Sequence, residues 1–188
     1  QKVMGSIEWD PMEKIVKRGV DVTPILSKAS ELISILAEYP HFRVIAVNSS
    51  TLNNSGAYIV QELGYALSWG NEYMNLLTSQ GVDADVAANN IKFNMGITEN
   101  YFMEIAKFRA ARMLWAEIVK QYKLKDIDSC EMVVNASTSE YNMTLFDSYV
   151  NMLRSQTEAM SATLGGVYSL VVTPFDKCYK QPDDFSER

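Results

Sequence analysis

The chain has 188 residues, of which 47% are hydrophobic and 21% charged, and its formal net charge is −6. This composition supplies enough apolar side chains for a packed core and excludes a disordered chain. The negative charge argues against nucleic acid or an anionic membrane as a partner, and no apolar run reaches membrane-spanning length. The two cysteines, Cys130 and Cys178, have no paired His or Cys nearby, so we expect reduced thiols and a cytoplasmic location.

The first quarter of the chain alternates between strand and helix signals. A strand is predicted at Lys2–Ile7, and an Asp-Pro pair at 10–11 then predicts a helix N-cap followed by proline at the first helical position. A Thr-Pro pair at 23–24 repeats that signature, and apolar residues at helical spacing continue the second helix until Pro40. The short β-branched run Arg43–Val47 is typical of a strand that is covered on both faces.

The middle of the chain predicts two long helices around a strand. An apolar stripe begins at Ile59 and ends near Gly81, a residue suited to a helix C-terminus. A short helix at Asp85–Asn89 precedes a strand at Ile91–Met95. The helix that follows, Glu99 to Tyr122, has apolar and alanine positions around most of its circumference, so we expect it to be buried more widely than a surface helix.

The last part of the chain repeats the alternation. A strand is predicted at Glu131–Ala136, and a helix at Leu145–Leu164 ends at a pair of glycines. A final strand is predicted at Tyr168–Thr173, and a further helix is expected to begin at Asp176.

Five strands alternating with helices indicate parallel βαβ units and the α/β class. Two architectures fit this pattern: an open doubly wound sheet, or part of an eight-stranded barrel. A glycine-rich phosphate loop would favour the first, and no strand end offers one. The chain also begins and stops in mid-pattern, so we expect a fragment of a larger fold, with residues 1–188 in a single domain.

Other chemistries find little support. The single histidine, His41, leaves no multi-His metal site, and the cysteine spacing gives no zinc cage. No Gly-x-Ser-x-Gly turn exists for a Ser-His-Asp site. We therefore expect a surface or structural role for His41, and no metal site.

The stretch FNMGITENYFMEIAKFRAARMLWAEIV, residues 93–119, resembles the barrel domain of the methylmalonyl-CoA mutase family. The likeness extends from about Gly5 to the end and includes SGAYIVQELGYAL and PFDKCYKQPDDFSER. The resemblance implies a partial (β/α)8 TIM barrel of about five parallel strands alternating with helices. It also implies a separate cobalamin-binding domain, which we expect to lie outside these 188 residues.

The family interconverts methylmalonyl-CoA and succinyl-CoA by a radical rearrangement that uses adenosylcobalamin. The cofactor supplies the radical, and polar side chains at the carboxyl ends of the barrel strands orient the thioester and the carboxylate. The resemblance therefore identifies the positions in this chain where those side chains would stand.

At most of these positions this chain has a different type of residue from the one that the family has. Leu52 occupies the place of a histidine that contacts the acyl carbonyl, and Asn135 and Val171 replace two further histidines. Ser137 stands where the family has Gln. Glu8 replaces another substrate-side Gln and would tend to repel the acyl-CoA carboxylate.

Arg18 is in register with a carboxylate-binding Arg, although Lys17 lies beside it and a solvated charge at a helix end is the simpler interpretation. These six residues are remnants of substrate positions, and no catalytic residue is predicted.

The resemblance therefore predicts a fragment of the small, non-catalytic subunit of a bacterial heterodimeric mutase. Its partner would be a homologous catalytic large subunit that holds adenosylcobalamin, and no cofactor is expected on the fragment itself, which should self-associate. One alternative is an active acyl-CoA mutase with a different substrate. Another is a free-standing scaffold or binding barrel.

Overall fold

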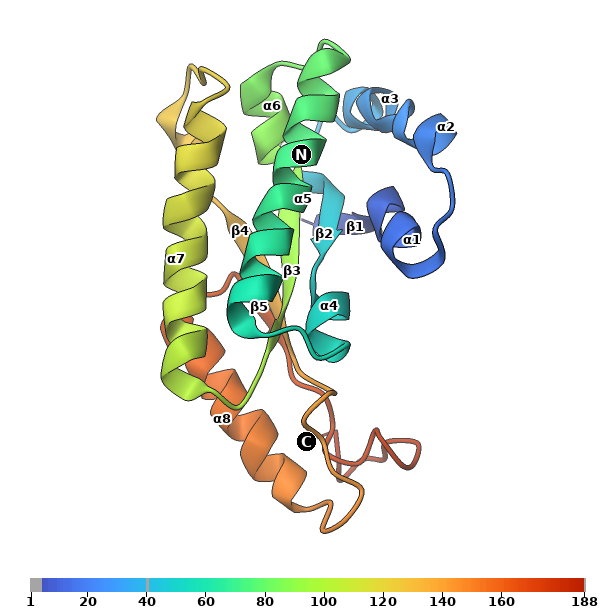
Figure 1. Cartoon of the computed structure of the whole chain (residues 1–188), viewed down its shortest axis with the longest axis vertical. Coiled ribbons are helices and arrows are strands. Elements are labelled where there is room, and N and C mark those ends of the chain that lie inside the picture. The colour runs from blue at the N-terminus through green and yellow to red at the C-terminus, as the bar shows by residue number, and fades with distance from the viewer. Residues whose placement is uncertain (1–4, 40, 188) are drawn as a thin grey trace. The chain divides into compact units, whose positions relative to one another are not determined.

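The computed structural model of the protein describes residues 5–39 and 41–187. Five parallel strands alternate with helices along the chain and form one sheet (Figure 1). The strands are β1 (Gly5–Trp9), β2 (Phe42–Asn48), β3 (Ile91–Ile97), β4 (Val133–Thr138) and β5 (Ser169–Val171). Their order in the sheet is β1-β2-β3-β4-β5, the order of the sequence. A doubly wound sheet would reverse its strand order at one point, so this order confirms the barrel interpretation.

Eight α-helices and one 3-10 helix connect the strands within the described residues. They are α1 (Pro11–Arg18), α2 (Thr23–Leu26), α3 (Ala29–Ile35), α4 (Ser50–Asn54), α5 (Ile59–Ser79), α6 (Ala84–Asn89), α7 (Tyr101–Lys120), η1 (Ile127–Cys130) and α8 (Val150–Gly165). No helix in this part of the chain is long and apolar enough to cross a membrane.

The chain packs into two compact units. The first contains the described residues within 1–48, together with 65–93 and 112–133, and the second contains 49–64, 94–111 and the described residues within 134–188.

The first unit is built on β1, β2 and the helices around them. Asp10 caps α1 by accepting a hydrogen bond from the Glu13 N–H, and Pro11 is the first residue of the helix, as predicted. The core includes the centre of β2 (residues 44–47), which is fully buried, and the ring pair Phe93–Trp115, whose centroids are 4.8 Å apart. Gly70 of α5 faces this ring pair, and a Cβ atom there would lie 2.6 Å from the Phe93 ring.

The second unit contains the N-terminal half of α7, most of β4, and all of β5 and α8. Its core includes Met95, Ile97, Phe108 and Ala162, all fully buried. Gly165 ends α8 against the Phe108 ring, where an added Cβ atom would approach to 2.8 Å. Close packing of helix against helix therefore requires glycine at this position.

Three helix predictions were wrong in extent or existence. The helix predicted from 23 to 40 is two helices, α2 and α3, that end at Ile35, and Pro40 lies outside the described residues. The interruption falls at residues 27–28, where the Ser27 hydroxyl donates to the Pro24 carbonyl and the Lys28 N–H donates to the Ile25 carbonyl. The helix predicted from Leu145 begins at Val150, because Asn151 binds the backbone of Thr144 through both its oxygen and its nitrogen.

No helix begins at Asp176, and residues 175–179 and 184–187 form turns instead. The Asp183 carboxylate accepts from the N–H groups of Phe185 and Ser186, which stabilises a local turn, and Pro182 lacks the N–H that a helix needs. The strand predicted at Lys2–Ile7 is β1, and the part before Gly5 lies outside the described residues.

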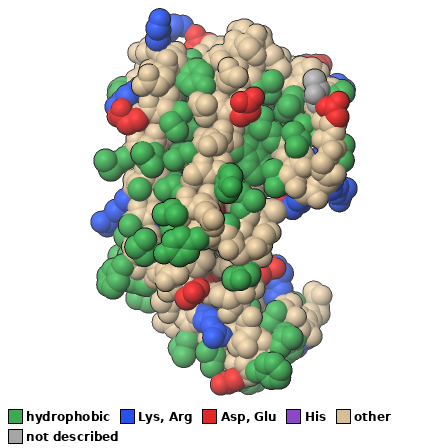
Figure 2. Space-filling view, viewed as in Figure 1, with side chains coloured by type: hydrophobic (Ala, Val, Ile, Leu, Met, Phe, Trp, Pro, Cys, Tyr) green, Lys and Arg blue, Asp and Glu red, His purple; other side chains and the backbone are tan. Residues whose placement is uncertain are grey.

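The wide burial predicted for α7 was also wrong. Its buried side chains form one stripe with helical spacing: Glu104, Lys107, Phe108, Ala111, Trp115 and Val119. Phe102 and Met113, two apolar residues outside this stripe, are 80% and 72% exposed. Apolar side chains thus reach the surface in several places, as the face drawn in Figure 2 shows.

Candidate functional site at the carboxyl ends of the strands

Three of the predicted site residues lie together on β4 and β5. Asn135 is opposite Ser169 and Ser137 is opposite Val171 in the parallel register, so these four side chains share one face of the strand pair. The Ser169 hydroxyl donates to Oδ1 of Asn135 at 2.8 Å. The Asn135 amide donates in turn to Oδ1 of Asn94 on β3 at 3.2 Å. The result is a row of neutral hydrogen-bonding groups that can orient a polar ligand but carries no acid or base.

Leu52 lies on α4, the short helix that follows β2, and is half-buried. Its isobutyl group cannot donate a hydrogen bond, and Val171 on β5 has the same deficit while being 64% exposed. Two of the three positions at which the resemblance predicts a histidine therefore carry a hydrocarbon side chain, and the third is Asn135.

Glu8 lies on β1 in the first unit and is paired with a lysine. The ammonium group of Lys92, on β3, donates to the Glu8 carboxylate and to the Ser6 hydroxyl, the latter at 2.7 Å. The Lys92 side chain is only 2% exposed. Because Lys92 neutralises Glu8, the expected repulsion of an anionic ligand at this position is offset.

Arg18 is exposed in the last turn of α1. The helix ends at Gly19, whose φ of +62° places it in the left-handed region, and Lys17 forms an ion pair with Glu13 one turn earlier. Cations here interact favourably with the C-terminal end of the helix dipole. The position of Arg18 therefore agrees with a charge at a helix end.

Asp10 follows β1 directly and is fully engaged with its neighbours. Its carboxylate accepts from the Tyr73 hydroxyl at 2.6 Å, the Asn48 N–H at 2.8 Å and the Glu13 N–H at 3.2 Å. Burial raises the pKa of Asp10 to about 6, although these hydrogen bonds oppose the shift. The carboxylate joins β1, β2, α1 and α5.

The second unit contains a buried charge cluster that the sequence analysis did not predict. It consists of Glu62 on α5 and Glu104 and Lys107 on α7, and all three side chains are fully buried. The Lys107 ammonium group lies 2.8 Å from Oε2 of Glu62 and 2.6 Å from Oε2 of Glu104. It also donates to the carbonyl oxygen of Gly96, at 2.6 Å.

The carboxylates of the buried charge cluster bind the carboxyl end of β3. Oε1 of Glu104 accepts from both the N–H and the hydroxyl of Thr98, and Oε1 of Glu62 accepts from the Gly96 N–H at 2.7 Å. Burial raises the pKa of Glu62, and Lys107 opposes that shift. Burial alone would lower the pKa of Lys107, but the two carboxylates beside it raise the pKa overall.

The sequence did contain a signal for this cluster. Glu104 and Lys107 fall on the same helical stripe as Phe108 and Ala111, which the apolar period predicts to be inside. Charged residues on a buried stripe require partners of opposite charge, so the pattern predicts an internal ion pair.

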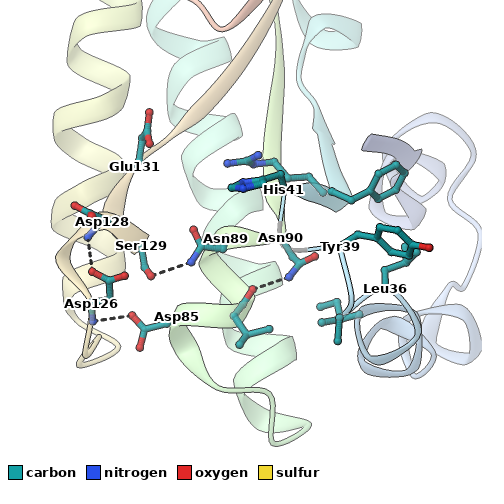
Figure 3. Close-up of a pocket in the computed structure, with 15 residues that line it drawn as sticks. Leu36, Tyr39, His41, Asp85, Asn89, Asn90, Asp126, Asp128, Ser129 and Glu131 are labelled. Carbon is teal, nitrogen blue, oxygen red and sulfur yellow. Dashed lines mark hydrogen bonds between the residues drawn. The ribbon is translucent and has the colours of Figure 1, made fainter. Parts of the chain in front are cut away.

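A cavity of about 520 Å³ lies in the first unit at the amino-terminal ends of β2, β3 and β4 (Figure 3). His41 and Arg43 at the start of β2 line it, together with Asp85, Asn89 and Asp126. The side chains of Asp85 and Asn89 are hydrogen-bonded to other residues that line the cavity: Asp85 accepts from the Asp126 N–H, and Asn89 donates to Ser129. Active sites of (β/α)8 barrels form at the carboxyl ends of the strands, so His41 is at the wrong end for that chemistry.

Within residues 5–39 and 41–187, no group of three or more His, Cys, Asp or Glu side chains could hold a metal ion. Both Cys130 and Cys178 are free thiols.

Comparison with known proteins identifies the family. A family model described as methylmalonyl-CoA mutase matches residues 1–188. The methylmalonyl-CoA mutase small subunit of Porphyromonas gingivalis is 49% identical over 189 residues, which cover all of this chain and 30% of that protein. The methylmalonyl-CoA mutase of Rhizobium meliloti is 34% identical, and the large subunit from Streptomyces virginiae is 33% identical, with 27% and 26% of their lengths covered. The chain thus spans less than a third of these relatives, and it belongs to the methylmalonyl-CoA mutase family.

Proposed function

We propose that this chain is part of the small, supporting subunit of a heterodimeric methylmalonyl-CoA mutase and does not itself isomerise the substrate. Residues 1–188 would form part of one barrel domain, with the cobalamin-binding domain elsewhere. The similarity to the small subunit of Porphyromonas gingivalis supports this assignment. The observation that carries it is the chemistry at the carboxyl ends of the strands, where Leu52, Asn135 and Val171 provide no group that titrates near neutral pH.

The loss of donors has a large expected effect on rate. Removing one preorganised donor beside a developing charge typically costs a factor of about 10²–10³. Leu52 and Val171 cannot donate at all, and Asn135 is already engaged with Asn94 and Ser169. Several such losses together would leave a barrel that packs normally but turns over no substrate.

Adenosylcobalamin belongs, in this proposal, to the partner. The single histidine of the chain is at the amino-terminal edge of β2, so the described carboxyl edges offer no imidazole to a cobalt ion. The catalytic large subunit would hold the cofactor, and the supporting subunit would contribute packing surface. Homologous chains commonly associate about a pseudo-twofold axis, which suits a pair of related barrels.

The test is turnover by the purified full-length chain, with adenosylcobalamin, in the absence of any large subunit. We expect no conversion of methylmalonyl-CoA to succinyl-CoA, and full activity once the large subunit is added. Measurable turnover by the chain alone would favour an active acyl-CoA mutase instead.

The partner is tested separately by purifying the tagged full-length chain from its native cell. We expect a mutase-like large chain at near one-to-one stoichiometry. If no such chain is recovered, a free-standing scaffold or binding barrel becomes the better interpretation.

A further inference from the structure

The buried face of α8 is unusually polar. Asn151, Ser155, Glu158 and Ser161 follow one another at helical spacing and are all buried. Part of this face lies against residues 139–149, the segment that connects β4 to α8 and is called here the β4–α8 loop. A polar face needs hydrogen-bond partners throughout, because each unpaired buried group costs free energy.

Glu158 and Asn142 of the β4–α8 loop form the closest contact across this face. The Asn142 amide nitrogen donates to Oε1 of Glu158 at 2.6 Å. The same nitrogen donates at 3.1 Å to the Glu99 carboxylate, which precedes α7. The amide therefore bridges two acidic side chains.

The remaining oxygen of each group in this pair has no hydrogen-bond partner within the described part of the chain. These atoms are Oε2 of Glu158 and Oδ1 of Asn142, and both are buried. An ionised carboxylate and an amide oxygen are both acceptors, so they cannot satisfy each other. A proton on Oε2 would turn that oxygen into a donor. A carboxylic acid and a carboxamide each have one donor and one acceptor side by side, and so can form two parallel hydrogen bonds.

We propose that Glu158 is a protonated acid that pairs with the Asn142 carboxamide through two hydrogen bonds, and that loss of its proton releases the β4–α8 loop. The added proton on Oε2 of Glu158 is then donated to Oδ1 of Asn142, so both oxygens that lacked a partner take part in a hydrogen bond. The pairing joins α8 to the β4–α8 loop, alongside the two hydrogen bonds between Asn151 and the Thr144 backbone.

The charges around Glu158 favour the protonated form. Burial is the main cause that raises the pKa of Glu158, to about 7, and the carboxylates of Glu99 and Glu104 raise it further. Hydrogen bonds from Asn142 and from the Ser139 N–H act in the opposite direction. The nearby cations are already engaged: Lys107 lies between Glu62 and Glu104, Arg154 donates to Asn151, and Lys180 pairs with Asp176 in the segment after β5.

The direction of the pH effect follows from linkage. Glu158 has a higher pKa in the closed loop than in an open, solvated one. The closed loop is therefore favoured fully at low pH, loses stability as the pH rises from about 4.5 to about 7, and changes little above that.

Opening would alter the mouth of the barrel. The loop carries Glu140 and Tyr141 directly after β4, and the Glu140 N–H donates to Oδ1 of Asn54 at 2.9 Å. The Tyr141 ring packs against Gly56, where an added Cβ atom would lie 3.0 Å away. This inference concerns the fold of the chain and holds whether or not the chain is catalytic.

The experiment is amide hydrogen exchange of peptides from the β4–α8 loop in the full-length protein, from pH 5 to pH 8. Rates are divided by the intrinsic rates of an unstructured peptide at each pH. Opening of the wild-type loop should increase on the order of 50- to 100-fold over this range, given the shift in proton affinity. Glu158→Gln should show almost no increase, because the glutamine amide retains one donor and one acceptor at every pH.

Two further variants keep the proposal falsifiable. Asn142→Ala should give an open loop at both pH values, because the acid loses its partner. Glu117→Gln, which changes an exposed acid on α7, should retain the wild-type pH dependence. If Glu158→Gln or Asn142→Ala opens with the same pH dependence as the wild type, the proposal is overturned.

Discussion

The Tyr73 hydroxyl donates a 2.6 Å hydrogen bond to the Asp10 carboxylate and so connects the middle of α5 to the start of α1. Tyr73 is fully buried, and its oxygen also accepts from the Met12 N–H. The two residues are 63 positions apart in the sequence, and both belong to the first unit.

Tyr73→Phe should destabilise the protein by about 1–3 kcal/mol, because a buried carboxylate and a backbone N–H each lose a partner. Urea unfolding of the full-length protein measures the change. Tyr65→Phe, on an exposed face of the same helix, is the control and should change the free energy of unfolding by less than about 0.5 kcal/mol. Equal effects of the two variants would contradict a special role for the Asp10 contact.

Asp10→Asn should change the pH dependence of stability. Burial raises the pKa of Asp10 from its ordinary value of 3.8 to about 6 in the folded protein. The unfolded chain therefore releases this proton first, and folding loses stability as the pH rises from about 4 to 6. Asparagine removes this contribution, so the variant's stability should fall less than that of the wild type between pH 4 and pH 6, as thermal unfolding would show. An unchanged difference between the two proteins across this interval would refute the prediction.

Lys107→Met should be the most damaging single change in the buried charge cluster. It leaves the carboxylates of Glu62 and Glu104 without their shared cation, and breaking such a buried pair costs about 3–5 kcal/mol. Lys120→Met in the same helix removes only an exposed ion pair with Glu117 and should cost less than about 1 kcal/mol. Chemical denaturation distinguishes the two, and a small effect at Lys107 would mean that the carboxylates find protons or water instead.

Gly70→Ala and Gly64→Ala form a matched pair on α5. An added Cβ atom at Gly70 would lie 2.6 Å from the Phe93 ring and 2.8 Å from the Trp115 ring, so we expect destabilisation of about 1–3 kcal/mol. At Gly64 nothing lies within 4 Å, and alanine should stabilise the helix by up to about 1 kcal/mol. The two variants should therefore shift the thermal midpoint in opposite directions. A shift in the same direction would show that the space around one of these positions differs from that described.

The isolated 188-residue chain should self-associate. The edge strands β1 and β5 offer unpaired backbone groups, and side chains such as Phe102, Phe146 and Val171 expose apolar surface that favours association. Light scattering at low micromolar concentration measures the mass. A stable monomer with a cooperative thermal transition would contradict this prediction.

Local signals in the sequence predicted the elements well where one residue type decides the structure. The Asp-Pro pair at 10–11 and the glycine near the end of α5 each have a stereochemical role that neighbouring residues cannot override. The wrong predictions fall where side chains bind the backbone in ways that apolar periodicity does not describe: Asn151 binds Thr144 ahead of α8, and Asp183 accepts from the Phe185 N–H in a turn.

The site was less predictable than the fold. The resemblance proposed Asn135, Ser137 and Val171 as candidates, and the register of β4 with β5 brings these three residues together. Lys92 could not be recognised as the partner of Glu8, because the two are 84 residues apart and only the sheet brings them into contact. Long-range ion pairs of this kind depend on tertiary packing, which the local pattern of a single sequence does not specify.

The buried charge cluster also bears on how such a chain can change over generations. Leu52 is half-buried and Val171 is exposed, so substitutions at these two positions leave the interior intact. The buried charge cluster differs in this respect. A change in Glu62, Glu104 or Lys107 alone leaves the other two charged groups buried without their partner. The strand ends can therefore vary one residue at a time, whereas the three positions of the buried charge cluster can change only together, and this constrains the sequence of α7 whatever chemistry the strand ends perform.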